Sequence, residues 1–286
     1  ATPTMTKDIA SKGAGGWIEA QMALPVNLIQ TPDYAIDFGL NDLIASRRAF
    51  TWLDGTYQSK VIMAPDQLRQ RVIWALLQYI PVNGQVQPYG IAEYFNVLQR
   101  NAFGNYRTLL RDVTVNRAMG FFLNNDQNKA VSAQCLTCAP NENYARELLQ
   151  LFSIGVVQLN PDGTIVRDST GKPKEAYSQK DVEELARALT GWSGVAGGNN
   201  GGGNWANFGF EMIPSSWSAE HDRDAKVVLG KNFPAGREAP QELETILDLL
   251  MAHPNIAPFV ALRMIQHLVT SDPSPQYLGR VSAVFR

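Results

Sequence analysis

The densest group of side chains able to do chemistry is the segment 141–148, NENYAREL. Glu142 and Glu147 are a pair of carboxylates suited to general acid/base work, in which one group gives a proton and the other takes one. The neighbouring side chains that would bind the substrate are Asn143, Tyr144 and Arg146. The alternative is structural, because Glu142 and Arg146 stand four residues apart and would form an ordinary ion pair on a solvated helix face.

A second segment, 178–192, places another arginine within reach of the first. Ser178 and Asp181 have the spacing of a capping box, and Gly191 ends the helix. If the two helices pack antiparallel, Arg187 could converge with Arg146 and the nearby carboxylates. Such a cluster would bind an anionic or carbohydrate substrate through an arginine fork, or form a buried ion network that holds the fold together.

Further candidates follow a Gly-rich stretch. His221 could assist as a general acid or base, since an imidazole titrates near neutrality, and Lys226 could bind an anionic substrate. A platform for the substrate would come from three tryptophans, Trp192, Trp205 and Trp217. The three histidines are far apart in sequence and show no ligand spacing, so we predict no metal site. Phosphate-binding and dinucleotide-binding motifs are absent, and we predict no cofactor.

Cys135 and Cys138 are the only cysteines and have CxxC spacing. The His that follows the second Cys of a haem-attachment site is missing, and no second CxxC completes a zinc site. In an oxidising compartment the pair would form a local disulfide in the loop before Asn141, whereas a thioredoxin-like role would need a βαβ context that the sequence lacks.

Helical periodicity dominates the chain, and we expect a mostly α fold: one irregular multi-helix domain over residues 1–286. The helices are expected near 4–11, 14–23, 33–50, 65–79, 88–102, 105–112, 116–123, 143–154, 179–190, 240–252, 255–269 and 275–286. Two turn signals predict a small β-hairpin excursion near 156–177. A long Gly/Asn-rich loop with aromatic residues near 193–217 suits either a binding loop or aromatics that pack onto the helices.

The charge and the ends of the chain exclude some classes of protein. The formal net charge is -2, with 25 basic and 27 acidic residues, so we expect no nucleic-acid partner. No stretch has the length of apolar residues that a transmembrane segment needs. The start lacks a signal-peptide pattern, and the final amphipathic segment stops without a cap. We therefore expect the chain to be a fragment of a longer protein.

The order of these motifs resembles the bacterial domain-of-unknown-function family eighteen-hundred. The resemblance rests on NENYAREL, on the ALTGW string that ends at Trp192, on AFGNYR from Ala102 to Arg107, and on His221-Asp222 and His253-Pro254. It implies an exported bacterial protein in a periplasmic or extracellular setting, where a Cys135–Cys138 disulfide is plausible. It also implies a possible partner, a co-encoded sulfatase-like exported protein, but carries over no catalytic residues.

Two hypotheses follow, and the sequence leaves open whether the protein is an enzyme. The first is an exported hydrolase-like enzyme acting on a carbohydrate or anionic substrate through the Glu/Arg/His cluster. The second is a non-catalytic cell-surface or extracellular-matrix protein in which the same residues form an internal ion network. Burial discriminates between them, because a catalytic cluster lines an open pocket and a structural one is closed and mutually satisfied.

Overall fold

The structure is a computed structural model that describes residues 3–30, 42–83, 88–132, 135–194, 209–215 and 220–285. Within those residues the fold is mostly α. The helices are α1 (Pro3–Met22), α3 (Asp42–Met63), α4 (Gln67–Tyr79), α5 (Pro88–Asn101), α6 (Tyr106–Thr114), α7 (Arg117–Phe122), α8 (Asn143–Glu147), α9 (Gln179–Ala188), α10 (Ala239–Ala252), α11 (Ile256–Leu268) and α12 (Pro275–Ser282).

The strands in the described residues are short and form two antiparallel pairs. β1 (Trp192–Ser193) pairs with β2 (Ile213–Pro214), and β3 (Lys226–Val228) pairs with β4 (Lys231–Phe233). The β3–β4 hairpin packs against α9 and was not expected from the sequence. Its turn contains Leu229 and Gly230, both at positive φ.

The expected excursion at 156–177 is present as a ladder of isolated antiparallel bridges. Val157 is bridged to Glu175, Leu159 to Ile165, and Arg167 to Pro173. This confirms a small hairpin-like excursion in a mostly helical fold.

Local capping explains where several helices begin. The Asn105 side chain accepts a hydrogen bond from the Arg107 N–H at the start of α6, and Asn116 does the same for α7. At the start of α9, Ser178 and Asp181 form the expected capping box. Such bonds satisfy backbone donors that have no partner inside the helix.

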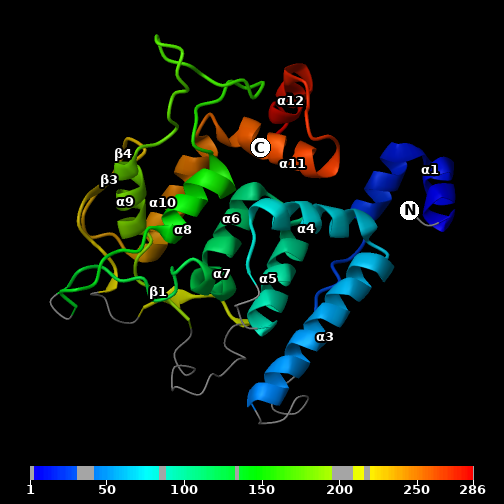
Figure 1. The fold of residues 1–286 in the computed structure, drawn as a ribbon, viewed down its shortest axis with the longest axis horizontal. Helices are drawn as coiled ribbons and strands as arrows, with labels where there is room; N and C mark the ends of the chain where they lie inside the picture. The colour runs from blue at the N-terminus through cyan, green and yellow to red at the C-terminus, as the bar shows by residue number, and fades with distance from the viewer. Residues whose placement is uncertain are drawn as a thin grey trace.

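The core is a continuous cluster of buried apolar side chains drawn from α4 through α11. Figure 1 shows α4, α5 and α6 at the centre, with α1 and α3 on one side and α8, α9 and α10 on the other. α1 contacts α4, and α3 contacts both α4 and α5. Among the described helices no single one has the length and apolar content of a membrane span. α10 and α11 have that length and apolar content only when taken together, and the pair is bent by 77°.

Three helix boundaries differ from the sequence expectation. α1 has a kink at Gly13, which is at positive φ, where two separate helices were expected. α3 continues to Met63, so the expected end near residue 50 is wrong. The helix expected over 143–154 changes at Leu148 from α to π geometry, as the segment η1 (Leu148–Ser153).

Candidate functional site

The NENYAREL segment begins a helix whose polar side remains at the surface. The Asn141 side chain accepts a hydrogen bond from the Asn143 N–H, which fixes the first turn of α8. Arg146 forms an ion pair with Glu142 at 2.7 Å, with side chains 40% and 36% exposed. Gln179, the first residue of α9, donates to the Glu142 carboxylate and accepts from Arg146. We call Glu142, Arg146 and Gln179 the surface cluster.

Glu147 lies at the junction of α8 and the π-helical segment η1. Its Oε2 atom is buried and has no hydrogen-bond partner within the described chain. Desolvation by the surrounding protein raises the pKa of this carboxyl, and the charge of Arg146 offsets only part of the rise. Single π-helical turns occur frequently at functional sites, so Glu147 has two features that are common among acid/base groups.

Asn143 and Tyr144 point in different directions. Asn143 is exposed at the first turn of α8. Tyr144 is 1% exposed, and its hydroxyl forms a hydrogen bond with Thr114 Oγ1 at 2.8 Å. Burial raises the pKa of the Tyr144 phenol well above its ordinary range. The Tyr144 side chain is therefore part of the packed interior of the protein.

Arg187 belongs to a separate cluster at the other end of α9. Its Nε and Nη2 atoms donate to the two carboxylate oxygens of Asp222 at 2.7 and 3.1 Å. Its Nη1 atom donates to Glu184 at 2.7 Å. Arg187 and Arg146 therefore have different carboxylate partners, and the convergence considered from the sequence does not occur.

Lys226 and Glu242 form the most deeply buried ion pair of this region. The Lys226 Nζ atom lies 3.1 Å from Glu242 Oε1, and both side chains are 0% exposed. Nζ also donates to the backbone carbonyls of Asp222 and Asp224, at 2.6 and 2.9 Å. All three ammonium donors of Lys226 are thus used inside the protein.

His221 lies between α9 and α10. Its Nδ1 atom is 2.9 Å from the Thr190 carbonyl oxygen, which can only accept, so Nδ1 carries a proton. Nε2 then faces Glu242 Oε2 at 3.4 Å. Gly191 permits the close approach of its own segment to His221, because a Cβ at position 191 would lie 2.7 Å from the His221 Cβ. We call the connected set the buried network; its members are Glu184, Arg187, His221, Asp222, Lys226 and Glu242.

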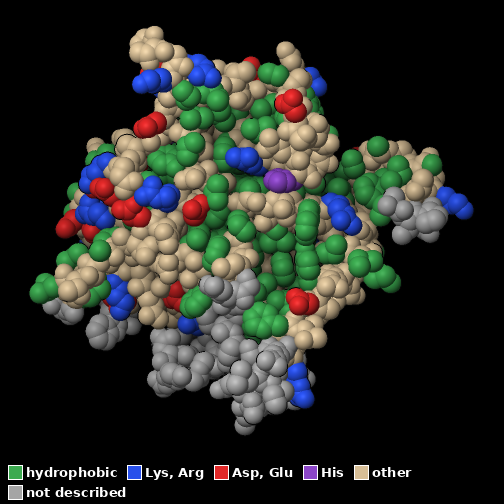
Figure 2. All heavy atoms as spheres, in the orientation of Figure 1, with side chains coloured by type: hydrophobic (Ala, Val, Ile, Leu, Met, Phe, Trp, Pro, Cys, Tyr) green, Lys and Arg blue, Asp and Glu red, His purple; other side chains and the backbone are tan. Residues whose placement is uncertain are grey.

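The electrostatics of the buried network follow from these contacts. Burial alone would raise the pKa of Asp222, but hydrogen bonds from Arg187 and from the Asp224 N–H, with the charge of Lys226, lower it. The pKa of Glu184 is likewise lowered, because Lys180 and Arg187 outweigh its desolvation. Figure 2 shows basic and acidic side chains gathered on the side of the molecule that carries α9, β3 and β4.

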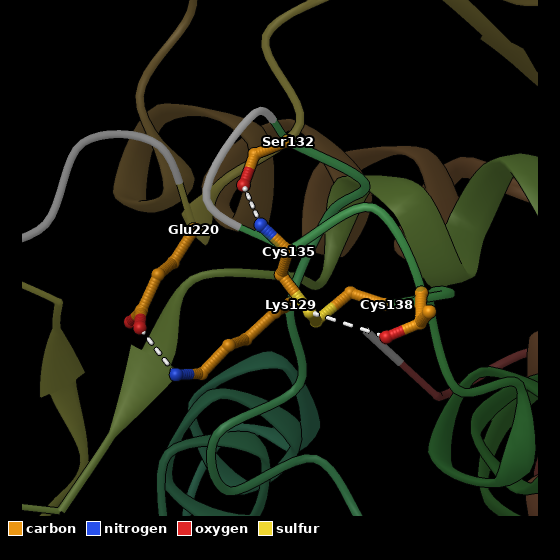
Figure 3. The surroundings of a disulfide bond; sticks show 6 residues. Lys129, Ser132, Cys135, Cys138 and Glu220 are labelled. Atoms are coloured by element: carbon orange, nitrogen blue, oxygen red, sulfur yellow. Dashed lines mark hydrogen bonds and ion pairs between the residues drawn. A yellow bond between two sulfur atoms is a disulfide. The ribbon is translucent and has the colours of Figure 1, made fainter.

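The remaining predicted site residues lie elsewhere. Trp192 is 5% exposed and packs in the core, with its Nε1 atom unpaired among the described residues. Trp205 and Trp217 lie outside the described residues. Cys135 and Cys138 form a disulfide, and Figure 3 shows it beside the Lys129–Glu220 ion pair. Within the described chain no three His, Cys, Asp or Glu side chains come together in a group that could hold a metal ion.

The sequence analysis missed Glu242, the acidic centre of the buried network. A clue was present in the pattern of α10, where Glu242 shares a face with Ile246 and precedes Leu243. An acidic residue on the apolar stripe of a helix needs a buried cationic partner. The lysine that meets it is 16 residues away in the chain, and sequence spacing alone does not reveal that contact.

Comparison with known proteins places the chain in a family. Over residues 1–286 it matches the family described as "Protein of unknown function (DUF1800)", and the chain belongs to that family. No curated protein and no solved structure matches the chain.

Proposed function

We propose that this chain is a non-catalytic structural or interaction domain of an exported bacterial protein. The observation that supports this most is the closure of the buried network. The Lys226 and Glu242 side chains are 0% exposed and form an ion pair with one another. Arg187 forms ion pairs with Asp222 and Glu184. These contacts fix the relative positions of α9, the 221–226 segment and α10, and they use all three ammonium donors of Lys226. His221 Nε2 and Glu242 Oε2 face one another at 3.4 Å, and neither atom has a hydrogen-bond partner within the described residues.

Export is the second part of the proposal, and the disulfide supports it. Disulfides persist mainly in oxidising compartments such as the periplasm and the extracellular space. In intact cells of the natural host treated with a thiol-alkylating reagent before lysis, we expect Cys135 and Cys138 to remain unmodified, and the protein to occur in the periplasmic or extracellular fraction. Alkylated cysteines in a cytoplasmic fraction would contradict export.

The partner we propose is the co-encoded sulfatase-like exported protein that the family resemblance implies. The test is co-purification from the natural host with an affinity tag on the full-length protein. We expect this partner in the purified fraction with the wild type and equally with Glu147→Gln, since an interaction domain needs no acid/base group. Absence of the partner from the wild-type fraction, or its loss in the variant, would contradict the proposal.

A second candidate function is hydrolase-like acid/base chemistry on a carbohydrate or anionic substrate, and Glu147 is the specific observation that favours it. This carboxyl combines a raised pKa, an unpaired buried oxygen and a position beside the half-exposed Arg146. A carboxyl with a raised pKa can hold a proton nearer to neutral pH and donate it to a leaving group. Glu142, on the same surface, would supply the second carboxylate.

The hydrolase hypothesis is tested by turnover of chromogenic glycosides, phosphate esters and sulfate esters. It predicts hydrolysis of one class by the wild type, and at least a hundredfold loss in Glu147→Gln at an unchanged melting temperature. The matched control is Glu183→Gln on α9, whose side chain is 44% exposed and whose replacement should leave turnover intact. No turnover by the wild type on any class, or full activity in Glu147→Gln, would contradict acid/base catalysis by Glu147.

A further inference from the structure

The segment between α7 and the disulfide loop contains two residues in an unusual backbone conformation. Asn124 and Gln127 have φ angles of 58° and 62°. Non-glycine residues rarely adopt this left-handed region, and the strain persists only where the surroundings hold it. Leu229, in the β3–β4 turn, is the third such residue among those the structure describes.

Backbone hydrogen bonds hold this segment in place. The N–H groups of Asn125 and Asp126 both donate to the Gly120 carbonyl, at 2.7 and 3.0 Å, and the Gln127 N–H donates to the Trp192 carbonyl at 2.9 Å. Gly120 permits this packing, since a Cβ there would lie 2.4 Å from a Met212 sulfur atom. The segment is therefore rigid and fixed to the core.

The charges of the segment are neutralised by direct partners. The Asp126 carboxylate accepts from Arg117 Nε at 3.2 Å and from the Gly194 N–H at 3.0 Å. Lys129 forms an ion pair with Glu220 at 2.5 Å, beside the disulfide (Figure 3). A ligand would therefore meet paired charges and hydrogen-bonding groups here, with no uncompensated ion.

A reciprocal pair of hydrogen bonds joins the end of this segment to the start of the NENYAREL segment. The Asn141 N–H donates to Asn128 Oδ1 at 2.8 Å, and Asn128 Nδ2 donates back to the Asn141 carbonyl at 3.3 Å. The disulfide loop ends at Cys138, between these two asparagines in the sequence.

Two adjoining hollows open over the segment, with volumes of about 530 and 280 Å³, and both are lined by Asn124, Asp126 and Gln127. Phe121 lines the larger hollow and is 51% exposed. Asn124 and Gln127 are exposed, and their side-chain amides make no hydrogen bond within the described chain. We call the two hollows together the amide groove.

We propose that the amide groove binds a neutral oligosaccharide. Each free amide offers two donors and one acceptor oxygen, which match the paired hydroxyl groups of a sugar ring. The exposed Phe121 ring provides an apolar surface against which the C–H face of a sugar can pack. A rigid site also lowers the entropic cost of binding. The groove is separate from Glu147 and from the buried network, so this proposal does not depend on the proposed function.

The test is titration of the full-length protein with two probes, the hexasaccharide of β-1,4-glucose and that of β-1,4-N-acetylglucosamine. The informative variant is Asn124→Gly with Gln127→Gly, because glycine removes both amides and adopts positive φ without strain. We expect the wild type to bind at least one probe and the variant to bind it at least tenfold more weakly. Its melting temperature should be unchanged or higher, because the left-handed strain is relieved.

The matched control is Gln276→Ala, which removes an exposed amide from α12 and should bind as the wild type does. Binding of neither probe, nor of any in a wider panel of neutral oligosaccharides, would overturn the proposal. Equal affinity of the double glycine variant would overturn it as well. So would binding limited to sulfated or uronic-acid oligosaccharides and abolished by salt, which would indicate an anion site.

Discussion

Replacing Arg187 with methionine is expected to destabilise the fold far more than the same change at Arg146. Arg187 makes three hydrogen bonds to two carboxylates that are only 15% and 7% exposed. Arg146 pairs with a carboxylate that is 36% exposed. Methionine keeps much of the apolar length of either side chain, so the change isolates the charged contacts.

The magnitude follows from these contacts. A hydrogen bond to a charged group contributes about 1.5 to 3 kcal/mol. The Asp222 and Glu184 carboxylates retain Lys226 and Lys180 nearby, and Arg187 is itself 25% exposed, so we expect a net loss of about 3 kcal/mol. With about 2.1 cal/mol/K of unfolding entropy per residue, this lowers the melting temperature by about 5 °C. An exposed pair such as Glu142–Arg146 contributes less than about 1 kcal/mol.

The difference between the wild type and Arg187→Met should also depend on pH. The pKa values of Asp222 and Glu184 are lowered in the folded protein, so their contribution is fully present above the ordinary carboxyl range, about pH 4. It is lost as the pH falls through the lowered values. The two proteins should therefore converge in stability at strongly acidic pH.

The assay is thermal unfolding followed by far-UV circular dichroism at pH 7 and over a series down to pH 2. Arg187→Met and Arg146→Met are measured beside the wild type. Equal small shifts in both variants would refute the reasoning, because the buried carboxylates would then not need Arg187. A difference that persists unchanged at pH 2 would refute the electrostatic cause.

Two further changes test other parts of the structure. The free energy of unfolding of Glu147→Gln at pH 7 should equal that of the wild type or exceed it by less than about 1 kcal/mol, because the change removes a desolvated charge. Since the pKa of Glu147 is raised, the stability of the wild type should fall as the pH rises through the interval between the ordinary and the raised value. Chemical denaturation of the wild type and Glu147→Gln over pH 4 to 7 measures this, and a difference in stability that stays constant with pH would contradict it. Gly155→Ala should lower the free energy of unfolding by more than about 2 kcal/mol, because φ is 69° and the new Cβ would lie 2.6 Å from the Phe259 ring. In Gly171→Ala, at φ 83° with open space around the Cβ, only the backbone strain remains; equal melting temperatures of the two alanine variants would count against the packing argument.

The helical architecture was largely predictable because it depends on local pattern. Apolar periodicity located α4 and α9, and the capping residues Ser178 and Asp181 marked the start of α9 within one residue. These features involve residues a few positions apart, and a single sequence contains them directly.

The features that the sequence did not predict depend on contacts between distant segments. The change to π geometry at Leu148 follows no apolar periodicity. The β3–β4 hairpin is only three residues per strand and is supported by its packing on α9. Arg146 contacts Gln179 at the start of α9, whereas Arg187, near the end of that helix, contacts Asp222 of the 221–226 segment. No local sequence pattern contains the packing of α9 against that segment, so the sequence did not show that the two arginines belong to different clusters.

The most direct test of the account is a double-mutant cycle on the buried pair Lys226 and Glu242, with Lys226→Met, Glu242→Met and the combined variant. A structural network predicts that each single change lowers the free energy of unfolding by about 3 kcal/mol, because the remaining charge stays buried without its nearest partner. Within the described residues, Lys226 then keeps only Asp222 as an ionic partner, at 3.6 Å, and Glu242 keeps only His221, at 3.4 Å. The combined variant should recover at least about 2 kcal/mol of the summed loss, while Lys180→Met, at the exposed end of the same region, should change little. A catalytic or ligand-binding site behaves in the opposite way, since removing its charges commonly stabilises the fold. Single variants more stable than the wild type would therefore contradict the account.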